Sequence, residues 1–238
     1  MAEIGDGYGS ECHLLRFLGR HRSYMDCQVL RAACADSIAW LDFHFDGTKR
    51  WPDGEWKGLD FLPPDPALAQ KWREFWPETG NPPNWDAVAQ IRIQGQTEWL
   101  LVEAKANLQE IKSRCQASAK GGRGRIERAL TSTKKTLGVP ESSNWMSGYY
   151  QLCNRIAVLN FLIANGVKAH LLFVYFLGDV GSSKRKCPRD QKEWESALEV
   201  QDRHVALPAK HLLSNRIHKL FLEVCPGQNR KQPSLPFR

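Results

Sequence analysis

A carboxylate and an ammonium group stand two residues apart at the end of an apolar segment. Residues 99–106 have the sequence WLLVEAKA, which predicts a buried strand with Glu103 and Lys105 near its end. Side chains two apart on a strand share one face, so Glu103 and Lys105 point the same way and Ala104 points the other way. Charges in this position cost free energy unless they are paired or take part in chemistry.

A second carboxylate is expected beside this pair. Residues 86–93 (DAVAQIRI) predict the preceding strand, and a turn around Gly95 folds the two strands into a hairpin with Asp86 next to Glu103. Two carboxylates this close repel each other, and a hard divalent cation such as Mg²⁺ or Mn²⁺ relieves the repulsion. Such a metal polarises a phosphoryl oxygen and activates a water, which Lys105 could orient or deprotonate. The alternative is a buried ion-pair network in a non-catalytic sheet.

The set Asp86…Glu103-Ala104-Lys105, on a hairpin preceded by a helix and followed by helices, resembles the PD-(D/E)XK superfamily of restriction-endonuclease-like nucleases. The resemblance covers the core, roughly residues 10–176, as a pattern and an order of elements. It implies a nuclease that hydrolyses DNA phosphodiester bonds in repair, recombination or restriction. In this family the Asp and the Glu hold Mg²⁺ or Mn²⁺, and the carbonyl between Glu and Lys, here that of Ala104, often helps. Many relatives are dimers, so a homodimer is also an expectation.

Three further positions are judged against the same family. Trp85 stands where the motif has proline, a position that is loose in the superfamily. Many members carry a metal-site glutamate on the helix before the sheet, and Glu11 matches it on the apolar stripe of the helix expected at 10–34. A simple complement to the helix N-terminus would explain Glu11 as well. Some relatives place a glutamine after the ExK strand near the scissile phosphate, and Gln151, near the start of the helix expected at 145–165, matches it.

The charge of the chain suits a polyanionic partner such as DNA. The formal net charge is +7, and basic residues concentrate between positions 112 and 135, where glycines interrupt them. Such a segment can follow a phosphate backbone, although a solvated helix face is the ordinary explanation of a charge run. Arg155 can contact DNA or act as a structural hydrogen-bond hub. The expected DNA contacts are Arg114, Lys120, Arg123, Arg125, Arg128 and Arg155.

The order of expected helices and strands predicts an α/β domain with a central mixed sheet flanked by helices. The family resemblance implies that this domain is a restriction-endonuclease-like αβββαβ core. A single domain is expected over residues 1–225, with an irregular Trp- and Pro-rich insertion at 46–84 and a disordered tail at 226–238. Strands are expected at 37–45, 86–93, 99–106 and 168–177. Helices are expected at 10–34 with Ser10 as N-cap, at 66–75, 145–165, 189–203 and 209–224, and as an interrupted tendency over 107–135.

Two other sequence patterns resemble functional sites but are not expected to form them. Residues 52–57 (PDGEWK) spell the nuclease motif, but Asp53 and Glu55 are only two apart and no hairpin fits between them, so a surface turn is expected. Glu55 and Lys57 can still line a substrate cleft. Three histidines, His204, His211 and His218, recur every seven residues. They have no acidic or cysteine partner at ligand spacing, which predicts surface or core histidines and no metal.

The tail and the cysteines bear on partners and location. Gln232, Leu235 and Phe237 resemble the short peptides with which bacterial replication and repair proteins bind the sliding clamp. Seven scattered cysteines without a CxxC pair favour a reducing cytosol. The chain shows no signal peptide and no membrane span, so a cytoplasmic protein is expected. The alternative function is a non-cleaving DNA-binding or clamp-associated protein that retains the nuclease fold.

Overall fold

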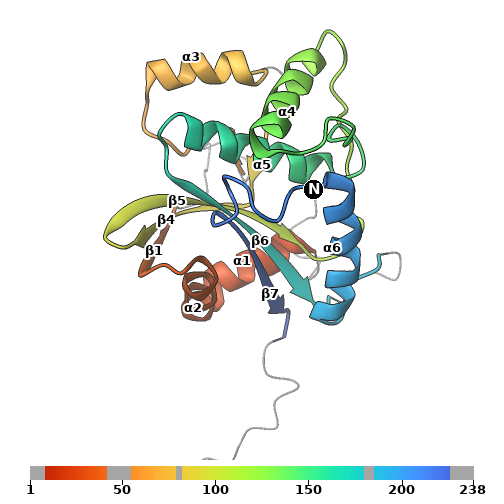
Figure 1. The fold of residues 1–238 in the computed structure, drawn as a ribbon. Coiled ribbons are helices and arrows are strands. Elements are labelled where there is room, and N and C mark those ends of the chain that lie inside the picture. Colours follow the sequence, from red (N-terminus) through yellow and green to blue (C-terminus); the bar gives the residue numbers. More distant parts are fainter. Residues whose placement is uncertain (1–8, 42–54, 79–81, 180–184, 226–238) are drawn as a thin grey trace, which may run out of the picture.

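The chain forms an α/β fold around a five-stranded mixed sheet, seen in the computed structural model (Figure 1). The strand order is β1-β4-β5-β6-β7; the β1–β4 and β4–β5 pairs are antiparallel, while the β5–β6 and β6–β7 pairs are parallel. The expected α/β class with a central mixed sheet is therefore confirmed. The structure describes residues 9–41, 55–78, 82–179 and 185–225. The sheet strands are β1 (Ser37–Trp40), β4 (Ala87–Ile93), β5 (Gln96–Lys105), β6 (Ala169–Leu177) and β7 (Ile217–Glu223).

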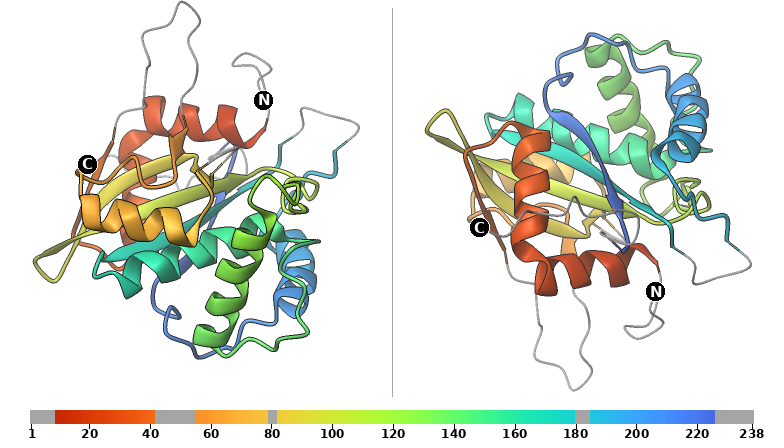
Figure 2. Two further views of the ribbon diagram at one scale, coloured as in Figure 1. Left: turned by 90° about the horizontal axis from the view of Figure 1, so that it is seen from above. Right: turned by 90° about the horizontal axis from the view of Figure 1, so that it is seen from below.

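Helices cover both faces of the sheet (Figures 1 and 2). Side chains of β5 point alternately to the two faces, so Leu101 joins the core under α5 while Leu100 and Val102 join the core under α1 and α2. Glu103 shares the face of Leu101. One layer contains α1 (Ser10–Arg20) and α2 (Arg22–Ala33). The other contains α3 (Pro66–Phe75), α4 (Arg123–Leu137), α5 (Tyr150–Ala164) and α6 (Gln191–Val205).

The β4–β5 hairpin sets the register of the candidate site. Gln94 and Gly95 both have positive φ, 49° and 81°, as a two-residue type I′ turn requires. This turn was expected, and it pairs Ala87 at the start of β4 with Val102. Continuing that register by one residue puts Asp86 opposite Glu103, on the face that α5 covers.

The helix expected at 10–34 is two helices. His21 has φ −121° and ψ 32°, which ends α1 and precedes α2. The break lets the apolar side chains of both helices, such as Leu14 and Val29, reach the same core on the sheet. Ser10 is the first helical residue and Gly9 is the N-cap, without a capping side chain, so the predicted cap is wrong.

The helix expected at 209–224 is also wrong, because the chain there turns and then forms β7. Strand β7 pairs in parallel with β6, with Leu220 beside Val174. Its side chains alternate between the two cores: Leu220 and Leu222 lie under α2, while Ile217 and Phe221 lie on the α5 side. This two-residue alternation, with an unpaired edge of β6 available, outweighs the helical tendency of the segment.

Two other helices begin later than expected. Residues 107–122 form turns and irregular chain, with one isolated bridge from Ser113 to Tyr149, and α4 starts only at Arg123, after Gly122. Gly122 has φ +91°, and a Cβ there would lie 2.5 Å from the Cβ of Pro77, so only glycine allows this close approach. Helix α5 begins at Tyr150 rather than near residue 145. The helices α3 and α6 and the strand β6 lie close to where the sequence predicts them.

The described part of the 46–84 insertion is more regular than expected. Besides α3, it contains a two-stranded antiparallel sheet of β2 (Trp56–Lys57) and β3 (Asn84–Trp85). Asp65 caps α3 by accepting hydrogen bonds from the N–H groups of Ala67 and Leu68. Positions 42–45 of the expected first strand, Asp53, and Gln232, Leu235 and Phe237 of the tail lie outside the described residues.

Candidate functional site

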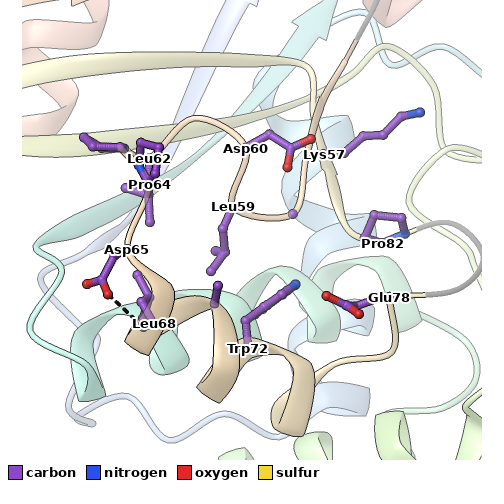
Figure 3. Close-up of a pocket in the computed structure, with 13 residues that line it drawn as sticks. Lys57, Leu59, Asp60, Leu62, Pro64, Asp65, Leu68, Trp72, Glu78 and Pro82 are labelled. Carbon is purple, nitrogen blue, oxygen red and sulfur yellow. Dashed lines mark hydrogen bonds between the residues drawn. The ribbon is translucent and has the colours of Figure 1, made fainter.

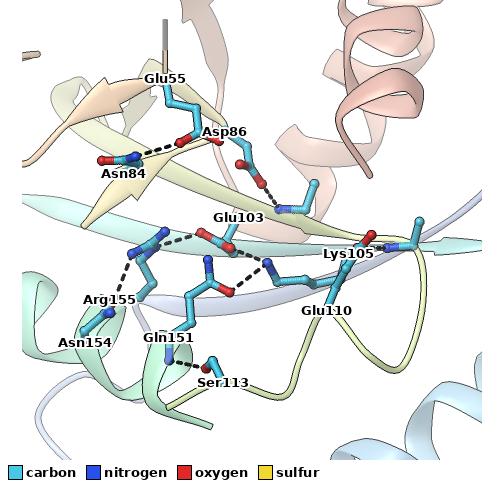
Figure 4. Close-up of polar contacts among 12 residues, drawn as sticks. Glu55, Asn84, Asp86, Glu103, Lys105, Glu110, Ser113, Gln151, Asn154 and Arg155 are labelled. Atoms are coloured by element: carbon cyan, nitrogen blue, oxygen red, sulfur yellow. Dashed lines mark hydrogen bonds and ion pairs between the residues drawn. The ribbon is translucent and has the colours of Figure 1, made fainter. Parts of the chain in front are cut away.

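Asp86 and Glu103 lie side by side at the end of the β4–β5 hairpin, as the sequence predicts (Figure 4). The Oδ2 atom of Asp86 accepts a hydrogen bond of 2.6 Å from the N–H of Ala104. Glu103 is 1% exposed and lies beneath Asp86, between the sheet and α5. The hairpin therefore brings two carboxylates to one point at the edge of the buried core.

The main chain of Ala104 belongs to the same point. In an extended strand the N–H and the C=O of one residue point to the same side. The N–H of Ala104 points toward Asp86, so its carbonyl faces that side too, beyond the last β4–β5 pair of Ala87 with Val102. Two carboxylates and a carbonyl are hard oxygen donors of the kind that Mg²⁺ accepts, with water completing its octahedron.

Glu103 is held between two cations. Its Oε1 accepts a 2.5 Å hydrogen bond from Lys105 Nζ, and its Oε2 accepts a 2.7 Å hydrogen bond from Arg155 Nε. Burial raises the pKa of Glu103, but the charges and hydrogen bonds of Arg155 and Lys105 outweigh it and leave the pKa below its ordinary value. The pKa of Lys105 is raised, because Glu103 and Asp86 outweigh its burial. Both groups are charged at neutral pH.

The pKa of Asp86 is raised, whereas that of Glu103 is lowered. Burial, followed by the negative charge of Glu103, raises the pKa of Asp86 to about 8, although Lys105 and the N–H of Ala104 oppose the shift. At neutral pH Asp86 is therefore mostly protonated in the metal-free protein. A divalent cation beside Asp86 would reverse this balance, because it stabilises the ionised carboxylate.

Gln151 reaches the site from the first turn of α5. Its Oε1 accepts a hydrogen bond of 3.1 Å from Lys105 Nζ, so the ammonium lies between Glu103 and Gln151. The backbone N–H of Gln151 donates to Ser113 Oγ at 2.7 Å, which fixes the start of α5. A helix N-terminus carries a partial positive charge and favours a phosphate nearby. Ser113 was missed, since nothing in its local sequence relates it to Gln151.

Arg155 is a buried hub rather than a surface contact. Its guanidinium is bonded to Glu103 Oε2 and Asn154 Oδ1, and it lies 5.1 Å from the centre of the Trp85 ring. Trp85 is itself fully buried and donates from Nε1 to the carbonyl of Gly58. The structure favours the hub interpretation of Arg155. Trp85, at the position of the motif's proline, packs against the guanidinium of Arg155.

A cavity of about 320 Å³ opens over Asp86. Its wall includes Glu55, whose Oε2 accepts a 2.8 Å hydrogen bond from Asn84 Nδ2. Glu55 thus lines this cavity, in agreement with the expectation that it can line a cleft. Lys57 lines a neighbouring cavity instead. Polar residues around the Asp86 cavity are Glu55, Asn84, Asp86, Ser113, Gln151, Asn154 and Arg155.

Glu11 lies in the first turn of α1, on the layer that covers the opposite face of the sheet from Glu103. The cavity over Asp86 is lined by other residues. Within the described ranges, no group of three or more His, Cys, Asp or Glu side chains is arranged to hold a metal ion. A metal at this site would therefore depend on Asp86, Glu103, the Ala104 carbonyl and water, and the metal role of Glu11 stays a prediction.

The expected DNA-contact residues are mostly exposed. Arg114 and Arg123 line a shallow cavity of about 730 Å³ together with Glu127. Arg114, on the wall of this cavity, follows along the chain Ser113, which lies on the wall of the Asp86 cavity. Arg125 is partly used in the fold, since its guanidinium donates to the carbonyl of Arg73 at 2.6 Å. Lys120 and Arg128 are exposed near the start of α4.

The three evenly spaced histidines have separate surroundings. His204 Nε2 lies 2.9 Å from the carbonyl oxygens of Asn144 and Ser147. His211 lies in the turn before β7. His218 lies on β7, stacked against His170.

Comparison with known proteins finds no match: no family model, curated protein or solved structure matches the chain. Among the described residues, no helix is long and apolar enough to cross a membrane. What the chain does must therefore be inferred from the geometry and the charges around Asp86 and Glu103.

Proposed function

We propose that this chain is a Mg²⁺-dependent phosphodiesterase that hydrolyses DNA, built on a restriction-endonuclease-like core. The observation that carries the proposal is the meeting of Asp86, Glu103 and Lys105 at the open end of one hairpin, on one face of the sheet. A binding module has no need of a second carboxylate beside the buried Glu103, because a buried carboxyl group costs free energy unless a cation or chemistry uses it. The raised pKa of Asp86 supports the same interpretation, because groups with perturbed pKa values cluster at functional sites.

The donor set fits a magnesium or manganese ion. Asp86, Glu103 and the carbonyl of Ala104 would hold it, and the bound ion would polarise a phosphoryl oxygen and acidify a water. Lys105 has the position to orient that water and to neutralise charge that develops on phosphate, because its Nζ lies between Glu103 and Gln151. The N-terminus of α5 adds a positive potential on the same side.

The remaining residues hold these groups in place. Arg155 keeps Glu103 ionised and fixes its rotamer, and Trp85 covers the guanidinium. Ser113 fixes the first turn of α5 and with it Gln151. Arg114 and Arg123, which line a cavity together, would contact the phosphate backbone. A phosphate bound over Asp86 would thus meet basic groups on the side of residues 113–123.

A second function has one observation in its favour. Glu103 already has two cationic partners within the chain, so the network is electrostatically satisfied without a metal. A DNA-binding protein that retains the fold but does not cleave would show the same contacts. It would bind DNA without requiring a divalent ion, whereas the enzyme would not cleave without one.

Cleavage assays separate the two functions. Purified protein is incubated with supercoiled, linear and single-stranded DNA in Mg²⁺, Mn²⁺ or EDTA, beside the variants Asp86→Ala and Lys105→Ala. We expect metal-dependent cleavage that falls by about 100-fold or more in both variants. Asp202→Asn serves as a matched control, because Asp202 pairs with Lys219 on the surface.

Two outcomes reject the nuclease. The first is equal cleavage by the wild type and both variants, which identifies a contaminating enzyme. The second is tight DNA binding by a folded wild-type protein without cleavage of any DNA form in either metal, which establishes the non-cleaving alternative. Metal binding is followed separately as a rise in the midpoint of urea unfolding with Mg²⁺ concentration.

A further inference from the structure

A second cavity lies between the segment after β2 and helix α3 (Figure 3). Its volume of about 500 Å³ is in the range of sites that hold a small organic group. Its wall combines polar and apolar groups, and Trp72 with leucine and proline side chains forms the apolar part. The apolar lining residues are Leu59, Leu62, Pro63, Pro64, Leu68, Ala69, Trp72 and Pro82.

The two cavities share a wall. Pro82 lines both of them, and the paired residues Lys57 and Asn84 of β2 and β3 line one cavity each. This wall is fixed by hydrogen bonds of Gly58, whose N–H donates to the Pro83 carbonyl at 2.7 Å and whose carbonyl accepts from a buried tryptophan at 2.9 Å. A molecule bound over Asp86 therefore has the second cavity as its neighbour.

The charges around the second cavity are those of a site for a neutral group rather than a phosphate. Among the described residues of its wall, Asp60, Asp65 and Glu78 outnumber the one cation, Lys57. Of these carboxylates, Asp65 caps α3, and Glu78 lies 4.0 Å from the guanidinium of Arg73. Three carboxylates repel a phosphate. Carboxylates can, however, accept hydrogen bonds from the amino groups of a base, and apolar side chains can cover the faces of its ring.

We propose that this cavity holds one unstacked nucleobase of the strand whose phosphate lies over Asp86. The inference rests on the proposed function and deepens it, because it names the substrate class: DNA with an unpaired nucleotide next to the cleavage position. A fully paired duplex keeps its bases stacked and can fill the cavity only by extruding a base, which costs free energy. Single strands and mismatched sites fill it at lower cost.

Filling the cavity tests the proposal. Ala69 lines it from α3, and Ala69→Trp would occupy the space of a base. Ala67→Trp is the matched control on the same helix, because Ala67 is exposed and lies outside the cavity wall. Binding of a labelled single strand and of its paired duplex is measured by fluorescence anisotropy with Ca²⁺ in place of Mg²⁺. We expect Ala69→Trp to weaken single-strand binding about 10-fold or more, with little change in the control or in duplex binding.

A change of DNA substrate tests the same inference with the wild-type protein. This test remains available if Ala69→Trp does not fold. Single strands with an abasic nucleotide at successive positions are compared, and 2-aminopurine is placed at the position where the loss of binding is largest. One position should weaken binding about 10-fold, with a change in 2-aminopurine fluorescence when the wild-type protein binds the strand.

The outcomes separate this inference from the proposed function. Equal binding of all abasic strands, or of Ala69→Trp and wild type, overturns the base cavity even if the protein cleaves DNA. If an abasic nucleotide at one position weakens binding but no DNA is cleaved, the base cavity is supported and the nuclease function is rejected. No DNA binding by the folded protein overturns both.

Discussion

Replacing Asp86 by asparagine should stabilise the metal-free protein while removing its response to Mg²⁺. Asp86 has a folded-state pKa raised to about 8, whereas an unfolded chain has an aspartate pKa of about 3.9. A raised carboxyl pKa means that the folded state binds the proton more tightly than the unfolded state. Folding stability is therefore lowered progressively as the pH rises from about 4 to about 8 and is constant above that range.

The magnitude follows from that difference in pKa. One pKa unit corresponds to about 1.4 kcal/mol, so the raised pKa of Asp86 lowers the stability at pH 7, relative to pH below 4, by at most about 4 kcal/mol. Asp86 is partly open to solvent through its cavity, which reduces the effect to about 2–3 kcal/mol. An asparagine keeps the shape and can still accept the N–H of Ala104 through its amide oxygen.

Urea unfolding at pH 5 and pH 8 in EDTA measures this effect. We expect Asp86→Asn to exceed wild type in free energy of unfolding by more at pH 8 than at pH 5. Added Mg²⁺ should raise the stability of wild type by about 2.7 kcal/mol at one hundred times its dissociation constant, and that of the variant by much less. Asp202→Asn is the control, because its exposed ion pair contributes little. The same pH dependence in wild type and Asp86→Asn would refute the reasoning.

Three further predictions concern the neighbouring residues. Glu103→Gln should destabilise the fold by about 3–5 kcal/mol, because it leaves buried Arg155 and Lys105 without their counterion; chemical unfolding measures it, and an effect below about 1 kcal/mol would show that the pairs are solvent-screened. Lys105→Gln should retain stabilisation by Mg²⁺ but lose cleavage by about 100-fold or more; unchanged cleavage would remove Lys105 from the chemistry. The double variant Arg114→Ala/Arg123→Ala should lower the slope of log affinity against log salt by up to about 2; an unchanged slope in DNA titrations would place the DNA elsewhere.

The sequence alone determined the part of the site that is local. Glu103 and Lys105 share a face because strand side chains alternate, and the Gln94–Gly95 turn fixes the register that brings Asp86 opposite Glu103. These relations involve residues fewer than twenty apart, so periodicity and turn chemistry suffice to find them. The buried strand β6 was predicted for the same reason, from its continuous apolar run.

Only the tertiary structure decided which distant residues complete the site. Arg155 reaches Glu103 and Ser113 reaches Gln151 because α5 packs on the sheet, and no spacing in the sequence encodes either contact. Tertiary structure likewise decided the position of Glu55, which is bonded to Asn84 although its segment was expected to form a surface turn.

Strand β7 likewise could not be predicted from its local sequence. Its residues have a helical tendency, but the free edge of β6 offers hydrogen bonds that the segment can satisfy only as a strand. Local preference differs among conformations by a few tenths of a kcal/mol per residue, whereas pairing with a neighbour and burial of Leu220 and Leu222 are worth more. Long-range packing therefore decided the last strand and the walls of both cavities, while the sequence determined the acidic pair and the lysine.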